Sequence, residues 1–322
     1  MTEATKEQTR KRPLVVLTGP TAVGKTQTSI RLAKAIGGEI ISADSMQVYK
    51  HMDIGSAKIT KEEMEGVPHF LIDVMEPTEN FNIVTFQTLA KQAMEEIYER
   101  GHIPIIVGGT GFYIQSVVYD VDFTESDEDT VFRKKMEDIA KTNGNHYLHE
   151  MLRKVDPAAA EKIHENNVKR VIRALEFFEQ THQKISEHNE TQLKKESPYN
   201  TYYFVLNCER KLLYERIDKR VDSMVECGLV DEVKALQAMG LTRQNVSMQG
   251  LGYKEILDYL DGNCSLEEAV DTIKLQTRHF AKRQIIWFRR ERNVIWVKKE
   301  DYDFDTDRIV SMMVQRIQEM QP

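Results

Sequence analysis

The sequence contains little cysteine and no long apolar run. Its three cysteines, Cys208, Cys227 and Cys264, are far apart, and no two of them have the spacing of zinc ligands. A disulfide framework is therefore not expected, and reduced thiols are typical of cytosolic proteins. No apolar stretch approaches the roughly 20 residues that a membrane-spanning helix needs. The polar segment 1–12 lacks the apolar core of a secretory signal, so we expect a cytoplasmic protein with a short disordered leader.

An excess of positive charge is also lacking. The 322 residues include 44 Lys and Arg against 51 Asp and Glu, which gives a formal net charge of −7. This total argues weakly against a nucleic-acid partner, but the distribution of charge along the chain matters more than the sum. At roughly 150 residues per domain, the length fits two domains or one domain with a large insertion.

Short apolar runs alternate with helical patterns in both terminal parts of the chain. The runs are typical of buried parallel strands and lie at 14–18, 39–43, 69–74, 103–107, 202–206 and 293–297. Helices are expected up to Ile36, where Gly37 is a stop signal, over 85–100, and from a capping box at Ser265 to about residue 290. This alternation predicts a parallel sheet with helical crossovers.

The pattern changes at Asp120. Residues 120–130 include six acids and no base, and they lack the glycine and spacing of a calcium loop, which favours a solvated linker. From 131 to 196 the pattern is helical. We therefore expect an α/β core over 13–120 and 198–322, interrupted by a helical insertion over 121–197.

A complete P-loop follows the first apolar run. The residues that match G-x-x-x-x-G-K-[ST] are Gly19, Pro20, Thr21, Ala22, Val23, Gly24, Lys25 and Thr26. The glycines let backbone N–H groups turn toward phosphate oxygens at the start of a helix, Lys25 supplies a positive charge, and the Thr26 hydroxyl suits Mg²⁺. We expect this loop to bind a diphosphate group. The motif alone favours a P-loop kinase or ATPase that binds ATP or another nucleotide, and it does not name the reaction.

Asp44 comes directly after the second apolar run, at a position that faces the ligand crevice in open α/β sheets. A carboxylate there can accept a proton or hold Mg²⁺, and it equally well caps a helix, since Asp is a favoured N-cap residue. The sequence Gly108-Gly109-Thr110-Gly111 follows another run, and either brings backbone close to a ligand or forms a tight turn. Position alone does not separate these alternatives.

A basic segment with interleaved aromatic residues lies near the C-terminus. Between Arg278 and Lys299 there are eight basic residues and one acid, Glu291. On a helix, Arg278, Lys282 and Arg289 share one face while apolar residues line another, an arrangement that suits contact with backbone phosphates. Taken alone, such a face is more often simply solvated. A second basic patch in the expected insertion consists of Lys169, Arg170 and Arg173.

Seven short motifs, taken in their order along the chain, allow a comparison with known families. They are GPTAVGKT (19–26), SADSMQVYKHMDIGSAK (42–58), PHFLIDVMEP (68–77), VGGTGFY (107–113), RALEFF (173–178), LGYKE (251–255) and TRHFAKRQIIWFR (277–289). Together they resemble the bacterial tRNA dimethylallyltransferase family, also called tRNA isopentenyltransferases. The resemblance covers nearly the whole chain, from about Leu14 to Trp296, and the combination of P-loop, DSMQVY and AKRQ–WFR is specific to that family.

The resemblance implies that the P-loop binds dimethylallyl diphosphate together with Mg²⁺, and not ATP as a phosphoryl donor. The implied acceptor is the N6 amine of the adenosine 3′-adjacent to the anticodon in tRNA, flipped out of its stack, and diphosphate leaves. Asp44 is implied as the general base, because an adenine amine is a weak nucleophile. Lys25, Mg²⁺ near Thr26 and an arginine then stabilise the leaving group. Arg220 is the candidate, with Arg216 one helical turn away, although both also fit a solvated helix face.

Contacts to tRNA are a further implication of the resemblance. The residues expected to make them are Asp44, Ser45, Met46, Gln47, Thr110, Arg173, Gly250, Tyr253, Lys254, Arg278, Lys282, Arg283 and Gln284. The chain departs from the family at two places. His164–Asn167 reads HENN where the family usually has His-Pro-Asn-Asp, and Ile286 stands where it usually has Thr. The role of the first segment therefore stays open.

The sequence thus predicts an α/β fold, with a P-loop NTPase-like parallel sheet and an inserted all-helical domain that contacts tRNA. We expect a monomeric, cytoplasmic prenyltransferase that modifies tRNA with Mg²⁺ as its cofactor. One alternative is a P-loop kinase for a small molecule, which would leave the basic C-terminal helix unused. Another is a nucleotide-gated RNA-binding module, which needs no carboxylate beside the phosphate site.

Overall fold

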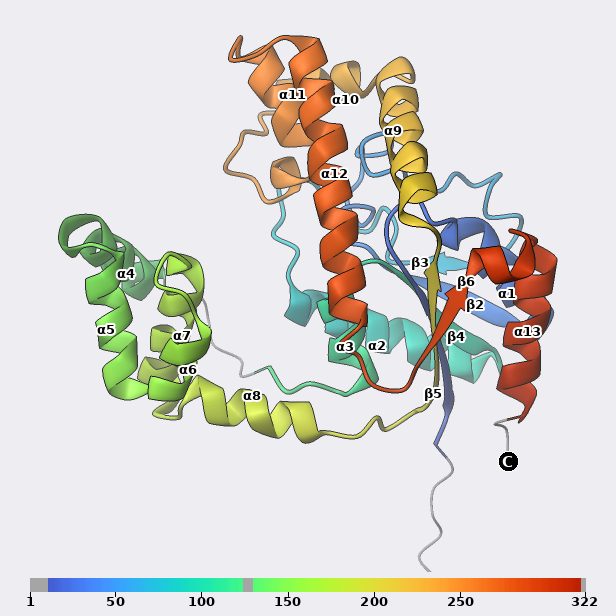
Figure 1. The fold of residues 1–322 in the computed structure, drawn as a ribbon, viewed down its shortest axis with the longest axis horizontal. Coiled ribbons are helices and arrows are strands. Elements are labelled where there is room, and N and C mark those ends of the chain that lie inside the picture. Colours follow the sequence, from blue (N-terminus) through green and yellow to red (C-terminus); the bar gives the residue numbers. More distant parts are fainter. Residues whose placement is uncertain (1–10, 124–129, 320–322) are drawn as a thin grey trace, which may run out of the picture. The chain divides into compact units, whose positions relative to one another are not determined.

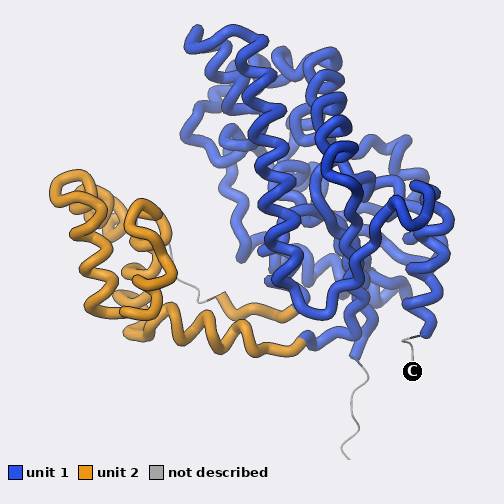
Figure 2. The backbone as a smooth tube through the Cα atoms, viewed as in Figure 1, with its two compact units in different colours: residues 1–118, 197–322 blue, residues 119–196 orange. Residues whose placement is uncertain are grey.

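The computed structural model describes residues 11–123 and 130–319. The chain divides into two compact units, one of residues 1–118 and 197–322 and the other of residues 119–196 (Figure 2). Most of the expected leader, 1–10, and most of the acidic segment, 124–129, lie outside the described residues. Arg12, which the prediction placed in the disordered leader, donates two hydrogen bonds to Glu95, so that prediction extended too far.

Six strands form a parallel sheet in the order β3-β2-β4-β1-β5-β6 (Figure 1). The strands are β1 (Pro13–Thr18), β2 (Gly38–Ala43), β3 (His69–Phe70), β4 (Ile103–Gly108), β5 (Asn200–Asn207) and β6 (Val294–Lys298). β2 is buried at every position and β1 at every position after the first. This lack of alternation is expected where helices cover both faces of a sheet. The parallel sheet predicted from the sequence is confirmed.

The carboxyl ends of three neighbouring strands are level with each other. Gly108 of β4 is the register partner of both Thr18 in β1 and Ala43 in β2. The hydroxyl of Thr18 also donates to the carbonyl oxygen of Gly108 at 2.6 Å. The segments that follow β1, β2 and β4 therefore leave the sheet side by side. This register brings the P-loop, Asp44 and the Gly108–Gly111 turn to one edge of the sheet.

Helices pack in layers around this sheet. The helices of the larger unit are α1 (Lys25–Ile36), α2 (Ile83–Glu99), α3 (Gly111–Val118), α9 (Arg210–Glu226), α10 (Leu229–Ala238), α11 (Tyr253–Leu260), α12 (Leu266–Phe288) and α13 (Thr306–Glu319), with short 3₁₀ turns η1 (Ser247–Gln249) and η2 (Lys299–Tyr302). α1 packs against α13, whereas α12 packs against α3, α9 and α11 (Figure 1). None of the helices within residues 11–123 and 130–319 has the length and apolar character needed to cross a bilayer.

Local signals set most of the element ends. Gly37 ends α1 with φ 62°, and Ser265 opens α12 with the expected capping box. The prediction of a strand over 69–74 is wrong beyond Phe70. Leu71 and Asp73 have φ values of 61° and 55°, a left-handed conformation outside the β region that regular strands adopt.

The smaller unit is a helical cluster with its own core. Its helices are α4 (Thr130–Asn143), α5 (Asn145–Val155), α6 (Pro157–Lys162), α7 (Val168–Thr181) and α8 (Ile185–Lys194). Leu148, Leu152 and Val171 are fully buried in it. Glu176 of α7 is buried as well, and its carboxylate accepts two hydrogen bonds from Arg133 and one from Arg173. Burial raises the pKa of Glu176, but these hydrogen bonds outweigh it and hold the pKa below its usual value.

Replacing Glu176 by Gln should destabilise this helical cluster. Gln keeps the shape but lacks the charge, and hydrogen bonds to charged groups contribute about 1.5–3 kcal/mol each. We expect the free energy of unfolding, measured by urea denaturation at pH 7, to fall by about 2 kcal/mol. Because the pKa of Glu176 is lowered in the folded state, its ionised carboxylate stabilises the fold at pH values above the ordinary Glu pKa of 4.5. This contribution disappears as the pH falls through the folded-state pKa.

The control is Glu179→Gln on the same helix, because Glu179 is exposed. Equal losses of stability in the two variants would show that the buried carboxylate contributes nothing specific.

Candidate active site

The P-loop is shaped by glycines in conformations that other residues avoid. Gly19 has φ 148° and Gly24 has φ 96°. A Cβ atom on Gly19 would lie 2.4 Å from the carbonyl oxygen of Leu206 in β5. Gly24 is the left-handed residue that precedes α1. The loop thus sits at a strand–helix junction, where backbone N–H groups and the helix dipole favour an anion.

Three charged side chains from different elements interact beside the loop, namely Lys25 of α1, Arg220 of α9 and Asp44 after β2. Burial and then the charge of Arg220 lower the pKa of Lys25 to about 7, and Asp44 partly opposes them. Burial likewise lowers the pKa of Arg220, against the attraction of Asp44. The Lys25 ammonium donates to the carbonyl oxygens of Gly19 and Pro20 at 3.0 and 2.9 Å. A bound anion would favour the charged form of both cations.

Asp44 orders a turn and does not cap a helix. Its Oδ1 accepts hydrogen bonds from the N–H groups of Met46 at 2.8 Å and Gln47 at 3.3 Å, which is the geometry of an Asx turn. Residues 45–48 form bends and turns, so the helix-cap alternative is wrong. Both hydrogen bonds fall on one oxygen, and an ionised carboxylate has a second oxygen that accepts a proton.

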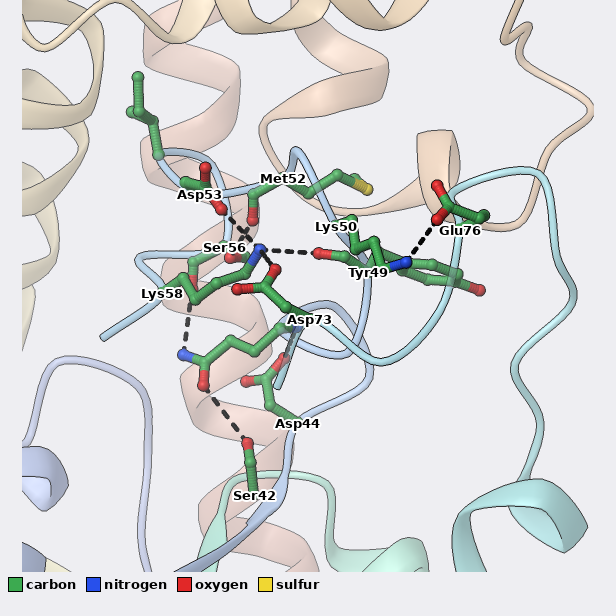
Figure 3. A network of polar contacts seen from close by, with 12 residues as sticks. Ser42, Asp44, Tyr49, Lys50, Met52, Asp53, Ser56, Lys58, Asp73 and Glu76 are labelled. Carbon is green, nitrogen blue, oxygen red and sulfur yellow. Dashed lines mark hydrogen bonds and ion pairs between the residues drawn. The ribbon is translucent and has the colours of Figure 1, made fainter. Parts of the chain in front are cut away.

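The loop that runs from Asp44 to Lys58, hereafter loop 44–58, is held together by its own polar side chains (Figure 3). The Lys58 side chain is only 4 % exposed, and its ammonium donates to the carbonyl oxygen of Tyr49 and to the carboxylates of Asp53 and Asp73 at 2.5–2.7 Å. The amide of Gln47 donates to the carbonyl oxygen of Ala57 at 3.2 Å. Gln47, expected to contact RNA, thus uses its amide inside the loop.

Gln284 of α12 connects two backbone segments of the site. Its Oε1 accepts from the N–H of Thr21 in the P-loop at 2.9 Å, and its Nε2 donates to the carbonyl oxygen of Gly109 at 3.0 Å. The residue is only 6 % exposed. The expectation that Gln284 contacts tRNA is therefore corrected, since its amide is buried and used by the protein. The spacing from Ala281 and to Phe288, both buried, already places it on the inner face of the helix.

Cations on α12 differ in their surroundings. The guanidinium of Arg278 pairs with the carboxylate of Asp218 through two hydrogen bonds of 2.9 and 2.6 Å. Lys282, Arg283 and Arg289 are exposed. The predicted cationic face therefore exists at Lys282 and beyond, while the charge of Arg278 is already balanced within the protein.

Tyr253 is a second correction to the expected tRNA contacts. Its ring is fully buried, and its hydroxyl donates to Glu232 at 2.8 Å. Gly250 leaves room for the side chain of Met46, because a Cβ atom on Gly250 would lie 2.5 Å from it. Lys254, by contrast, is exposed.

The remaining expected tRNA contacts divide between the two units. Ser45 and Thr110 are half-buried, and the N–H of Thr110 donates to the carbonyl oxygen of Ala43 at 3.4 Å. Arg173 belongs to the smaller unit, where it donates to Glu176 at 2.8 Å.

Lys299 belongs to the site, although the sequence indicates only its place in the basic segment 278–299. It is 5 % exposed, directly after β6, and its ammonium donates to the carbonyl oxygen of Val23 in the P-loop at 3.4 Å. A Cβ on Gly24 would lie 3.0 Å from that ammonium. Burial and then the charge of Arg216 lower the pKa of Lys299. A cation that directly follows the last strand thus reinforces the positive character of the loop.

The chain is similar to enzymes that transfer prenyl groups. It is 61 % identical over 302 residues to the tRNA dimethylallyltransferase of Lachnoclostridium phytofermentans, a match that covers 94 % of this chain and 96 % of the relative.

Solved structures show the same likeness. The tRNA isopentenylpyrophosphate transferase of Bacillus halodurans matches with a TM-score of 0.72 and 47 % identity over 96 % of this chain and 98 % of its own. A eukaryotic dimethylallyltransferase that acts on tRNA matches with a TM-score of 0.77 and 33 % identity, and the match covers 89 % of this chain and 74 % of its own. These likenesses confirm the expected P-loop NTPase-like α/β fold. Since residues 47–291 also match the model described as IPP transferase, the chain belongs to the IPP transferase family.

Proposed function

We propose that this protein transfers the dimethylallyl group of dimethylallyl diphosphate to the N6 amine of the adenosine 3′-adjacent to the anticodon in tRNA, with release of diphosphate. Family membership supports prenyl transfer to tRNA and counts against a small-molecule kinase. The structural observation that carries the proposal is the register of β1, β4 and β2, which brings the P-loop with Lys25 and the carboxylate of Asp44 to one edge of the sheet, where the charge of Asp44 also opposes the lowering of the pKa of Lys25 and Arg220. One carboxylate beside two cations suits a reaction that removes a proton and releases an anion.

At the donor end, the loop amides, Lys25 and Arg220 would hold the diphosphate. As the bond between C1 of the dimethylallyl group and oxygen breaks, the diphosphate takes the electron pair and its charge grows. Desolvated cations stabilise that charge more strongly than they would in water.

Mg²⁺ fits the donor set at this position. Thr26 is exposed in the first turn of α1, and Mg²⁺ is typically bound by few protein oxygens together with phosphate oxygens and water. The part of the chain that the structure describes has no cluster of three His, Cys, Asp or Glu residues that would hold a metal unaided. When bound, Mg²⁺ would neutralise charge on the diphosphate.

At the acceptor end, Asp44 would act as the general base. The lone pair of an adenine amine is delocalised, so the nitrogen needs to lose a proton as it bonds to C1 of the dimethylallyl group. The Asp44 carboxylate accepts that proton, while the N–H groups of Met46 and Gln47 keep the carboxylate oriented. We further propose that the enzyme works as a cytoplasmic monomer.

The direct test is to incubate the protein with Mg²⁺, unmodified tRNA and dimethylallyl diphosphate and to weigh the digested nucleosides. A dimethylallyl-adenosine is expected, and it should not form without the donor. An unmodified nucleoside pool after long incubation would contradict the proposal.

Asp44→Asn should separate the possible roles of this carboxylate. Asn preserves the Asx turn but cannot accept the proton, and losing a general base typically slows a reaction by about 10²–10⁴. We expect single-turnover transfer at saturating substrates to slow by that factor, with donor and tRNA binding nearly normal. Recovery of the rate at raised Mg²⁺ would indicate a metal ligand, and near wild-type turnover would remove Asp44 from the mechanism.

The lowered pKa of Lys25 makes donor binding dependent on pH. Above the pKa of about 7 the unliganded amine loses its proton, and binding of an anion has to restore it. Between pH 7 and 8.5 we expect the affinity for dimethylallyl diphosphate to fall by roughly tenfold, measured by isothermal titration calorimetry. Lys25→Arg should bind with little pH dependence, because Arg stays charged throughout. An equal dependence in both proteins would assign the titration to another group.

The cations of α12 should contribute unequally to tRNA binding. Replacing the exposed Lys282 by Ala should make the fall of log K with log salt shallower. The magnitude of the negative slope should decrease by about one, the size expected for one phosphate contact. Arg278→Ala on the same helix is the matched comparison, and should change the slope less because Asp218 already balances its charge. Filter binding across salt concentrations measures both, and the reverse order would show that Arg278 leaves Asp218 for the RNA.

A further inference from the structure

Glu232 of α10 binds the backbone of loop 44–58 at three consecutive residues. Its Oε2 accepts from the N–H groups of Asp53 at 2.8 Å and Ile54 at 2.7 Å, and its Oε1 accepts from that of Gly55 at 3.0 Å. Successive N–H groups that point the same way form an anion-binding nest. Here the anion is a side chain of the same protein, contributed by a helix that lies 177–179 residues further along the chain.

Tyr253 of α11 completes this arrangement. Its hydroxyl donates to the same Oε1 at 2.8 Å, and its fully buried ring lies against the loop, where a Cβ on Gly55 would come within 2.6 Å of the ring. Burial and then the nearby charge of Glu232 raise the pKa of Tyr253 well above its usual value, so the hydroxyl remains a donor. Four donors thus converge on one carboxylate.

The bound end of the loop connects to Asp44 through further hydrogen bonds. The carboxylate of Asp53 accepts from Lys58, which also donates to the carbonyl oxygen of Tyr49 (Figure 3). Gln47 then joins Ala57 to the segment whose N–H groups hold Asp44. Polar contacts, joined by the peptide bond between Ala57 and Lys58, therefore link Glu232 to the carboxylate proposed as the general base.

The backbone of the loop needs such support. His51 and Ala57 have φ values of 63° and 45°, a left-handed conformation that costs roughly 1–2 kcal/mol for each residue that is not glycine. Such residues persist where surrounding contacts fix them. Glu232 holds the backbone N–H groups of residues 53–55 in this strained segment, and Lys58 holds the carbonyl oxygen of Tyr49 and the carboxylate of Asp53.

We propose that Glu232 is a positioning residue for prenyl transfer: it fixes loop 44–58, with Tyr253 as its partner, so that Asp44 is presented to the acceptor adenosine. The inference rests on the proposed function. Binding of the donor, which depends on the P-loop, should not require it, whereas the rate of the transfer step should.

The test compares Glu232→Gln with Asp231→Asn. Asp231 is the exposed neighbour in the same first turn of α10, so its variant loses the same charge beside the same helix end without touching the loop. In either orientation of the amide, Gln presents an N–H₂ group where the carboxylate accepted two hydrogen bonds. Misplacement by about 1 Å costs up to about 10² in rate, so we expect kcat to fall by about 10- to 100-fold in Glu232→Gln and to be unchanged in Asp231→Asn.

One binding measurement and one folding measurement separate positioning from a general loss of structure. The Kd for dimethylallyl diphosphate should match that of the wild type in both variants, and so should the fraction of folded protein at the assay temperature. A wild-type kcat in Glu232→Gln, or a loss that only follows the unfolded fraction, would overturn the inference. Tyr253→Phe leaves α10 intact, and it should lower kcat less, with a non-additive effect when combined with Glu232→Gln.

Amide hydrogen exchange tests the contact between Glu232 and residues 53–55 without an activity assay. The amides of residues 53–55 should exchange faster in Glu232→Gln than in the wild type or in Asp231→Asn. If the wild type fails to prenylate tRNA, the proposed function fails, yet this comparison still decides whether Glu232 holds the loop. Equal exchange in all three proteins would overturn the positioning role.

Discussion

The close approach of backbone segments at the carboxyl edge of the sheet is the constraint on which the site depends. A Cβ on Gly108 would lie 2.2 Å from the carbonyl oxygen of Ala43, and one on Gly19 would lie 2.4 Å from that of Leu206. Strands β2, β4, β1 and β5 are thus packed together at their ends without intervening side chains. Because of this contact, the P-loop and Asp44 emerge next to each other, and a phosphate site gains a carboxylate beside it.

Around that edge, the protein concentrates desolvated cations in a chain whose net charge is −7. Lys25, Arg220 and Lys299 come from three different elements, and burial lowers the pKa of each. Such an arrangement is costly for the protein alone and favourable once an anion is bound. The glycines and the register supply the geometry, and these cations supply the affinity and the charge stabilisation.

Much of the fold and of the phosphate site could be predicted from the sequence, because the patterns that indicate them are local. The buried runs, the P-loop and the caps at Gly37 and Ser265 depend on neighbours within a few residues. The errors at the site concern residues whose partners are distant in the sequence. Gln284 looked like part of an RNA-facing helix, yet its partner Thr21 lies 263 residues away. Glu232 was not among the expected site residues, since no local pattern indicates three backbone donors 177–179 residues earlier. Side-chain direction on a helix follows from spacing, but the identity of the facing segment does not.

The contacts of Gln284 and Lys299 with the P-loop have a consequence for biosynthesis. The loop leaves the ribosome long before the groups that tie it in place, which are 263 and 276 residues further along the chain. Its neighbour β5 also follows the helical unit. A nascent or prematurely terminated chain that stops before these residues therefore contains the phosphate-binding motif without the structure that supports it, and competence for catalysis arises only after Gln284 and Lys299 have been synthesised.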